Sequence, residues 1–306
     1  MQAQRAALVA AVTGSALWGL SGTAAQVVLQ AYLFPVWGFV MIRMLGAALL
    51  LMAIARPEWP HPWKLSFASL AVLGLVGSQA TYLEALFYSN VTTATLLQFL
   101  FLPMVAGYEL VRGTIRWSAW WAVLLTLAAV GTVLLVGTIT SAGFSVLITP
   151  LGLLFGILSA IAGAYYTLAA RQFVQKETAQ WVTTWGFLLG GLVTAPLGAY
   201  SLAQYHWPTT LASGSLLAGL VLFVVIAGTL LAFTLFVYGL RNLTATEAGV
   251  AASFEPIVAA AAGFAILGVA LSALQYVGGA LIIIAVALLG ARTQSRTAPS
   301  QRVGRP

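Results

Sequence analysis

The sequence contains no cysteine and no aspartate, and it has only two histidines among 306 residues. Without cysteine the chain has neither a disulfide framework nor a thiolate metal site. The residues of a common zinc cluster or of a Ser-His-Asp triad are likewise missing. There is no Walker-type phosphate loop, so ATP is not expected to drive the protein directly. These absences predict a protein that is not an enzyme and needs no cofactor or metal ion.

Charge is also scarce, because charged residues make up 6% of the chain and hydrophobic residues 61%. A soluble domain carries roughly a quarter charged residues, so a soluble fold of this size could not cover its own surface. The apolar residues fall in runs of about 20, the helix length that crosses a bilayer core. The sequence therefore predicts an all-α integral membrane protein in a lipid bilayer, and its net charge of +7 does not indicate a nucleic-acid partner.

Ten apolar runs can be placed between the polar turns and proline-containing breaks of the chain. We expect transmembrane helices at about 6–29, 35–55, 65–88, 91–111, 117–137, 147–170, 180–203, 213–239, 244–267 and 271–290. The first run is too long for the apolar core of a cleavable signal peptide, so it should remain as a helix. The polar, arginine-rich segment 291–306 is predicted to form a disordered basic tail.

The lysines and arginines outside these runs all fall on one side of the ten-span layout. They are Arg5, Arg56, Lys64, Arg112, Arg116, Arg171, Lys176, Arg241, Arg292, Arg296, Arg302 and Arg305. Loops of a membrane protein that are rich in lysine and arginine stay in the cytoplasm. We therefore expect a multi-pass protein of the plasma or inner membrane with both termini in the cytoplasm.

A weak internal repeat relates the two halves of the chain. The segment from Ser89 to Pro103 parallels the segment from Asn242 to Pro256, and each places a proline about three turns into a helix that follows a polar turn. Each half, 1–140 and 141–290, contains five spans. Because five is odd, the second half must cross the membrane in the opposite sense, which is the inverted repeat typical of secondary transporters.

Motifs in the first, second and ninth spans resemble the EamA family of the drug/metabolite transporter superfamily. The residues that carry this resemblance are Gly14-Ser15-Ala16-Leu17-Trp18-Gly19, Arg43 and Ser253-Phe254-Glu255-Pro256. The resemblance extends over about 8–290 and implies ten helices as two inverted five-helix repeats around a central cavity. It also implies export of amino acids or other small metabolites.

One feature departs from the family pattern. EamA-like repeats often have a Gly-Glu pair after their fourth helix, and this chain has Gly113-Thr114 and Gly268-Val269 at those places. We interpret the missing pair as a structural difference.

Arg43 and Glu84 are ionisable residues within predicted spans, where a charge costs at least ~2.5–3.5 kcal/mol and should face the protein interior. Both lie toward the outer ends of their helices, so the long guanidinium could reach the carboxylate. The pair could be a structural salt bridge between two helices. Alternatively, it could form an outer gate or leave Arg43 to bind a substrate carboxylate.

Glu255 lies near the middle of the membrane, directly before Pro256. It could bind a substrate amine or a coupling proton, which makes protons a candidate partner. The alternative is a neutral carboxyl that hydrogen-bonds within the bundle. Pro103 and Pro256 each remove one helical hydrogen bond, freeing the carbonyls of Phe99 and Ala252, and matched prolines in the two halves predict hinges.

Uncharged polar and aromatic residues complete the candidate site. Gln79 with Tyr82, and Gln98 with Thr95, are spaced three apart and so share a helix face. Trp18 lies on one face with Ser15 and Gly22, as does Tyr166 with Ser159 and Gly163. Such residues could instead be contacts between closely packed helices, an alternative that is strongest for the faces of Trp18 and Tyr166.

These observations favour a secondary transporter that moves a small amphipathic metabolite, such as an amino acid, by alternating access, and they favour an exporter. Arg43, Gln79, Gln98 and Glu255 would hold the polar part of this small-molecule substrate, and aromatic residues its apolar part. An uptake carrier or uncoupled facilitator is the alternative within transport. A non-transporting membrane scaffold or an embedded enzyme is the alternative from another class.

Overall fold

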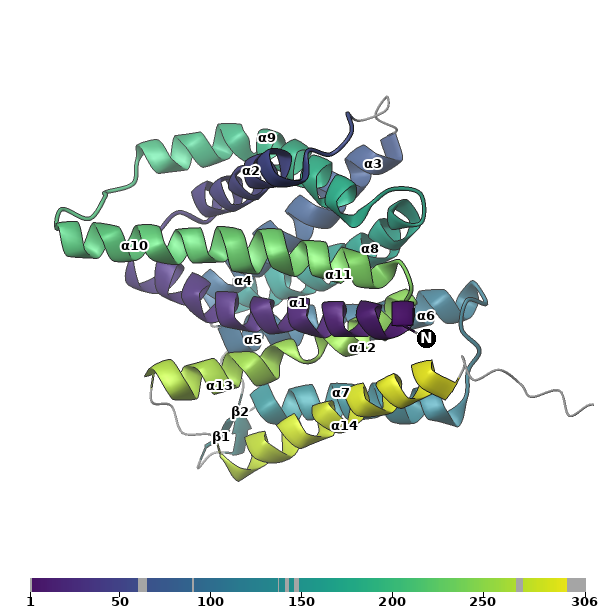
Figure 1. Ribbon diagram of the computed structural model, residues 1–306. Helices are drawn as coiled ribbons and strands as arrows, with labels where there is room; N and C mark the ends of the chain where they lie inside the picture. Colours follow the sequence, from purple (N-terminus) through teal and green to yellow (C-terminus); the bar gives the residue numbers. More distant parts are fainter. Residues whose placement is uncertain are drawn as a thin grey trace, which may run out of the picture.

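The computed structural model describes residues 2–59, 65–89, 91–136, 138–140, 143–145, 149–267 and 272–295. Nearly all of these residues are helical, and the helices lie roughly along one direction in a single bundle (Figure 1). Within the described ranges the only strands are β1 (Thr138–Thr140) and β2 (Gly143–Ser145), an antiparallel hairpin that pairs Thr138 with Ser145. The expected helical fold is confirmed, with this small hairpin as an addition.

The first half of the chain forms helices at the expected places. They are α1 (Gln2–Gln26), the π-helical η1 (Val27–Ala31), α2 (Val36–Ala55), α3 (Leu65–Ser69), the π-helical η2 (Leu70–Val76), α4 (Gly77–Tyr88), α5 (Val91–Gln98), α6 (Phe101–Val111) and α7 (Ala119–Val136).

The second half does the same. Its helices are α8 (Pro150–Val174), α9 (Ala179–Ala203), α10 (Leu211–Phe223), the π-helical η3 (Val224–Leu231), α11 (Ala232–Leu240), α12 (Ala245–Ala252), α13 (Glu255–Leu267) and α14 (Ala273–Ser295). Because α14 continues to Ser295, residues 291–295 of the expected tail are helical. The rest of that tail, and the predicted turns at 60–64, Asn90 and Gly268-Val269, lie outside the described residues.

Six continuous helices among the described residues are long and apolar enough to cross a membrane. They are Gln2–Ala31, Val36–Ala55, Leu65–Tyr88, Pro150–Val174, Ala179–Ala203 and Leu211–Leu240. Shorter apolar helices, Phe101–Val111, Ala119–Leu134 and Tyr276–Ala285, lie within three further expected spans. The chain is therefore a multi-pass membrane protein, and the count of ten spans stays a prediction.

The expected spans 91–111 and 244–267 are each divided into two helices. The first breaks at Phe99 and Leu100, between α5 and α6, and the second at Ser253 and Phe254, between α12 and α13. In both cases the proline falls in the first turn of the new helix, where its missing N–H would be unpaired anyway. Pro103 and Pro256 thus coincide with real helix breaks, and bending at these points stays a prediction.

The backbone at the breaks finds partners inside the protein. The Phe99 carbonyl, expected to be free, accepts a 3.1 Å hydrogen bond from the Leu102 N–H. At the second break the Ser15 hydroxyl of α1 donates to the Ala251 carbonyl at 3.2 Å. Irregular backbone within a membrane is stable only where it is satisfied in this way or faces a cavity.

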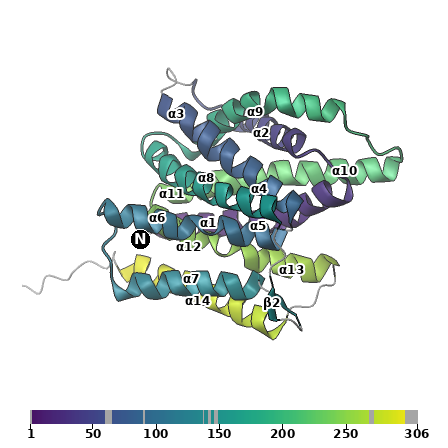
Figure 2. The same ribbon diagram turned by 180° about the vertical axis from the view of Figure 1, so that it is seen from behind.

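Small residues allow the helices to approach closely. Figure 2 shows α7 and α14 side by side, with α8, α4 and α5 in front of the rest of the bundle. At the α7–α14 contact a Cβ on Gly131 would lie 2.9 Å from the Gly278 carbonyl oxygen and 2.8 Å from Ile282 Cγ1. The glycine therefore sets the separation of this pair, as small residues do in membrane interfaces.

A matched pair of glycine substitutions tests this packing. Gly131→Ala should lower the thermal unfolding midpoint of the purified protein, because overpacking costs about 1–3 kcal/mol. Gly219→Ala is the control, since nothing lies within 4 Å of a Cβ at that exposed position of α10. It should keep or raise the midpoint, because alanine is favoured over glycine in helices. Equal midpoints for the two variants would contradict the packing.

Candidate functional site

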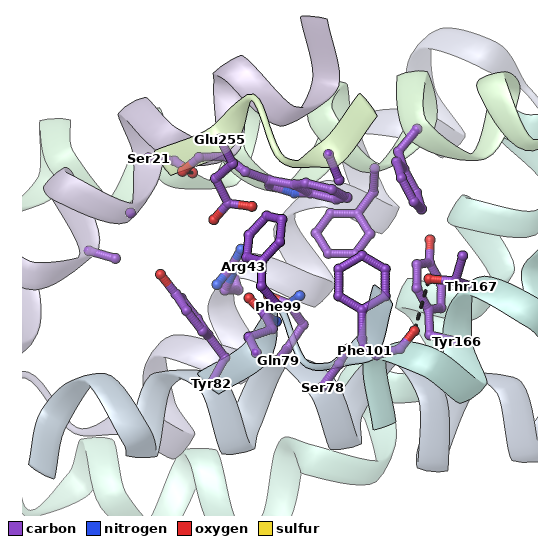
Figure 3. Close-up of a pocket in the computed structure, with 18 of the residues that line it drawn as sticks. Ser21, Arg43, Ser78, Gln79, Tyr82, Phe99, Phe101, Tyr166, Thr167 and Glu255 are labelled. Atoms are coloured by element: carbon purple, nitrogen blue, oxygen red, sulfur yellow. Dashed lines mark hydrogen bonds between the residues drawn. The ribbon is translucent and has the colours of Figure 1, made fainter. Parts of the chain in front are cut away.

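A cavity lies inside the bundle beside both helix breaks. It holds about 750 Å³ of empty space, counting its mouth, and Figure 3 shows the side chains that surround it. Its lining comes from α1, α2, α4, α8, η3 and α11, and from residues at the breaks of both divided helices. The same prolines that interrupt these helices therefore bring irregular backbone to the cavity wall, as in transporter sites.

All the predicted site residues except Glu84 line this cavity. Those that do are Trp18, Arg43, Gln79, Tyr82, Gln98, Tyr166 and Glu255. Glu84 lies elsewhere on α4, half-buried, where its carboxylate accepts a hydrogen bond from the Trp37 side chain. The structure thus gathers residues from six helices that the sequence could associate only by type and depth.

Arg43 is anchored by η3 rather than by Glu84. Its side chain is 4% exposed, and Nε donates to Thr229 Oγ1 at 2.9 Å. The Thr229 hydroxyl in turn donates to the Val224 carbonyl, five residues earlier in the π-helical turn. Among the described residues Arg43 makes no ion pair, so the pairing with Glu84 is absent from this structure, and its formation in another state stays a prediction. Each of the two side chains turns toward a different neighbour, Thr229 for Arg43 and Trp37 for Glu84.

Glu255 is the first residue of α13 and is 9% exposed. Its carboxylate extends into the cavity, into the space that the Arg43 guanidinium approaches from α2 (Figure 3). Within the described part of the chain no ion pair or side-chain hydrogen bond engages this carboxylate. The carboxylate oxygens are therefore available to a molecule in the cavity.

Two aromatic side chains at the cavity carry polar atoms without partners. Trp18 Nε1 and Tyr166 Oη are buried, and neither has a hydrogen-bond partner among the described residues. Buried donors of this kind are rare, since most find a protein or water partner. Both residues line the cavity, although the two polar atoms themselves are buried. By contrast, the Tyr82 hydroxyl bonds to Thr95 Oγ1 at 3.2 Å.

The apolar wall of the cavity consists of phenylalanines, which were not among the predicted site residues. They are Phe99, Phe101, Phe233 and Phe236. The Trp18 ring packs between the last two, with centroid distances of 4.8 and 5.0 Å. Phe99 and Phe101 flank the break before Pro103, a signal that could have identified them. Phe233 and Phe236 are spaced as one helix face, which does not distinguish a cavity wall from ordinary core.

The missed polar residues of the lining are mostly hydroxyls. Ser21, Ser78 and Thr167 line the cavity and donate to carbonyls of their own helices. Together the lining offers a cation, a carboxylate, several hydroxyls and an aromatic wall. Such a cavity is suited to a small molecule that carries both charges and an apolar part.

Comparison with known proteins relates the whole chain to membrane transporters. Residues 150–291 match the EamA-like transporter family. The uncharacterized inner membrane transporter YicL of Salmonella typhimurium is 30% identical, with 97% of this chain and 99% of that protein aligned. The uncharacterized transporter YwfM of Bacillus subtilis is 23% identical, and 90% of each chain is aligned. One solved crystal structure, 20% identical, superimposes with a TM-score of 0.74 over 95% of this chain and 99% of its own.

The two cavity tyrosines allow the unpaired donor to be tested without a ligand. Tyr82→Phe should destabilise the purified protein by about 0.5–1.5 kcal/mol, because it removes the hydrogen bond to Thr95. Tyr166→Phe should leave the thermal midpoint unchanged or raise it, because its hydroxyl has no described partner to lose. A larger loss for Tyr166→Phe than for Tyr82→Phe would show that the Tyr166 hydroxyl is satisfied after all.

Proposed function

Because this chain belongs to the EamA-like transporter family, we propose that it is a secondary transporter that exports a small zwitterionic metabolite, such as an amino acid, by alternating access. The observation that carries this proposal is the pair of opposite charges, Arg43 and Glu255, that line one cavity without pairing with each other. The transporter class rests on the family. The substrate class rests on the cavity.

The charges supply complementary halves of a zwitterion site. A guanidinium binds a carboxylate through parallel N–H donors, and with Nε held by Thr229 its terminal nitrogens are oriented for such a contact. The Glu255 carboxylate would accept from the ammonium group. Burying two unpaired charges within a membrane is costly, and a substrate that neutralises both offsets that cost. The phenylalanine wall and the Trp18 ring would contact the substrate's side chain.

Matched irregularities in the two halves support alternating access. The π-helical segments η2 and η3 occupy equivalent places in the third and eighth expected spans, and the helix breaks do so in the fourth and ninth. Inverted repeats of this kind switch the open side of the site by exchanging the conformations of the two halves. Such matched features are not required of a scaffold or an enzyme.

Uptake remains the rival to export, because the same cavity would serve both directions. The direction in which substrate accumulates against its own imposed concentration gradient, measured in oriented vesicles, distinguishes export from uptake. Uncoupled diffusion in the same vesicles would favour the facilitator instead.

Replacement of Glu255 tests the substrate site. Glu255→Gln should keep the fold, because the amide preserves the shape of the side chain. It should nonetheless reduce transport of an amino acid by at least about tenfold, the effect of losing one charge-assisted hydrogen bond. Glu177→Gln makes the same chemical change after the end of α8, away from the cavity, and should transport normally. Reconstituted protein and radiolabelled substrate provide the measurement, and normal transport by Glu255→Gln would remove its proposed role.

Substrate analogues separate the two charges. In the wild-type protein, an amine that lacks the carboxylate should inhibit transport of the amino acid only weakly. An N-acetylated amino acid, which lacks the ammonium group, should also inhibit it only weakly. In Glu255→Gln the difference in affinity between the amino acid and the acetylated analogue should be smaller than in the wild type. In Arg43→Gln the difference in affinity between the amino acid and the amine should be smaller than in the wild type. The opposite assignment would reverse the proposed orientation of the substrate.

The orientation of the chain is a further part of the proposal. We place the face of the bundle at which α1 begins, called here the N-terminal face, in the cytoplasm, because the cations outside the helices gather there. A single cysteine at Thr114, in the turn between α6 and α7, should label with an impermeant reagent only in inverted vesicles. A cysteine at Thr209, between α9 and α10, should label in intact cells. Labelling of Thr114→Cys in intact cells would reverse the orientation.

A further inference from the structure

Glu109 of α6 is a buried carboxylate that the proposed site does not use. Its side chain is 2% exposed and accepts three hydrogen bonds from the first turn of α12. The donors are the Ala245 N–H at 3.1 Å, the Thr246 N–H at 2.9 Å and the Thr246 hydroxyl at 2.7 Å. A residue of the first half thus caps a helix of the second half, although the two are separated by more than a hundred positions in sequence.

Helix α12 already has a cap of its own. Thr244 and Glu247 form a reciprocal capping box, with Glu247 accepting from the Thr244 N–H at 2.8 Å and Thr244 accepting from the Glu247 N–H at 3.1 Å. This box, which the sequence pattern predicts, satisfies the start of α12 locally. The contribution of Glu109 is therefore different in kind, because its bonds join α12 to α6.

The joined helices lie between the cavity and the N-terminal face. Helix α6 runs from Phe101 at the cavity to the N-terminal face, and α12 runs from that face to Ala252 at the cavity. Figures 1 and 2 both show them side by side at the end of the bundle where the chain begins. A Cβ on Gly249 would lie 2.8 Å from Leu102 Cδ1, so no gap remains between them. This contact packs a helix of the first half against a helix of the second half between the cavity and the N-terminal face.

The opposite end of the cavity is arranged differently. Helices α5 and α13, the remaining pieces of the two divided spans, make no comparable contact in the part of the chain that the structure describes. When Pro103 is aligned with Pro256, Ala262 takes the place of Glu109, and Ala94 takes the place of Glu247. Glu109, which joins α6 to α12, and Glu247, the acid of the capping box, therefore have no acidic counterparts at the aligned positions of the opposite face.

We propose that Glu109 is a latch between the two halves, holding the cavity closed toward the N-terminal face, and that transport requires the release of its bonds to α12. Because one face has this latch and the other lacks it, the resting protein favours the state closed at the N-terminal face. This inference rests on the alternating-access part of the proposed function. A ligand that favours one of two states shifts their populations, so substrate binding has to overcome the latch.

A single reporter cysteine tests the latch directly in this cysteine-free chain. Ala252→Cys places a thiol on the cavity wall, and its labelling by an impermeant methanethiosulfonate is measured from each side of oriented vesicles. With Glu109 intact, labelling from the N-terminal face should be slow. Glu109→Gln keeps the size of the side chain but turns an amide NH2 toward donors, and it should accelerate this labelling about tenfold.

Two further variants separate a latch from a merely structural residue. Glu247→Gln weakens the cap within α12 and should lower the thermal midpoint without changing the side from which the reporter labels. Thr246→Val removes one of the three bonds to Glu109, and should give an intermediate acceleration even if Glu109→Gln does not fold. If neither Glu109→Gln nor Thr246→Val changes the sidedness of labelling, the latch is disproved.

The labelling needs neither substrate nor transport, so the latch and the zwitterion site can fail separately. A change in sidedness in Glu109→Gln, together with normal transport by Glu255→Gln, would keep the latch and remove the proposed site. Unchanged sidedness of labelling in Glu109→Gln, together with loss of transport in Glu255→Gln, would remove the latch and keep the proposed site.

Discussion

A backbone amide or carbonyl in the hydrocarbon core of a membrane needs a hydrogen-bond partner inside the protein. Nearly all described residues meet this constraint within helices, and the exceptions are concentrated where function is expected. The breaks at Phe99 and Ser253 adjoin the cavity. There the Phe99 carbonyl accepts from the Leu102 N–H, and the Ala251 carbonyl accepts from the Ser15 hydroxyl. In the π-helical turn of η3 the Thr229 hydroxyl donates to the Val224 carbonyl and accepts from Arg43 Nε. Departures from the regular helix thus position the polar groups of the site.

The buried charged side chains of the bundle differ in the hydrogen-bond partners that surround them. Glu109 receives three donors and is fully engaged in joining α6 to α12. Arg43 is held at one nitrogen, and Glu255 presents its carboxylate to the cavity. A carboxylate that is saturated by backbone donors stabilises a conformation, whereas one that is left open is available to a ligand. Glu109 and Glu255 are both buried, so burial does not distinguish a structural acid from a binding acid. The number of hydrogen-bond donors around each carboxylate does.

Much of the candidate site could be found from sequence, because a polar residue within an apolar span is rare enough to attract notice. Arg43, Gln79, Gln98 and Glu255 were identified in this way. Glu84 was included on the same ground, yet it bonds to Trp37 away from the cavity. The sequence gives the depth of a side chain along its helix, but the direction in which that side chain points depends on how neighbouring helices are rotated. Glu109 escaped notice because it lies near a span end, where carboxylates are usually solvated.

By itself the sequence determined the membrane class, the helix positions, the two prolines beside the breaks and the capping box at Thr244. Each of these depends on local properties: apolar length, proline geometry and hydrogen bonds within a few residues. Only the tertiary structure decided that Thr229 holds Arg43, that Phe233 and Phe236 form a cavity wall, and that Glu109 clamps α12. These contacts join residues from separate helices. Their geometry follows from side-chain packing between helices, which periodicity along one chain does not encode.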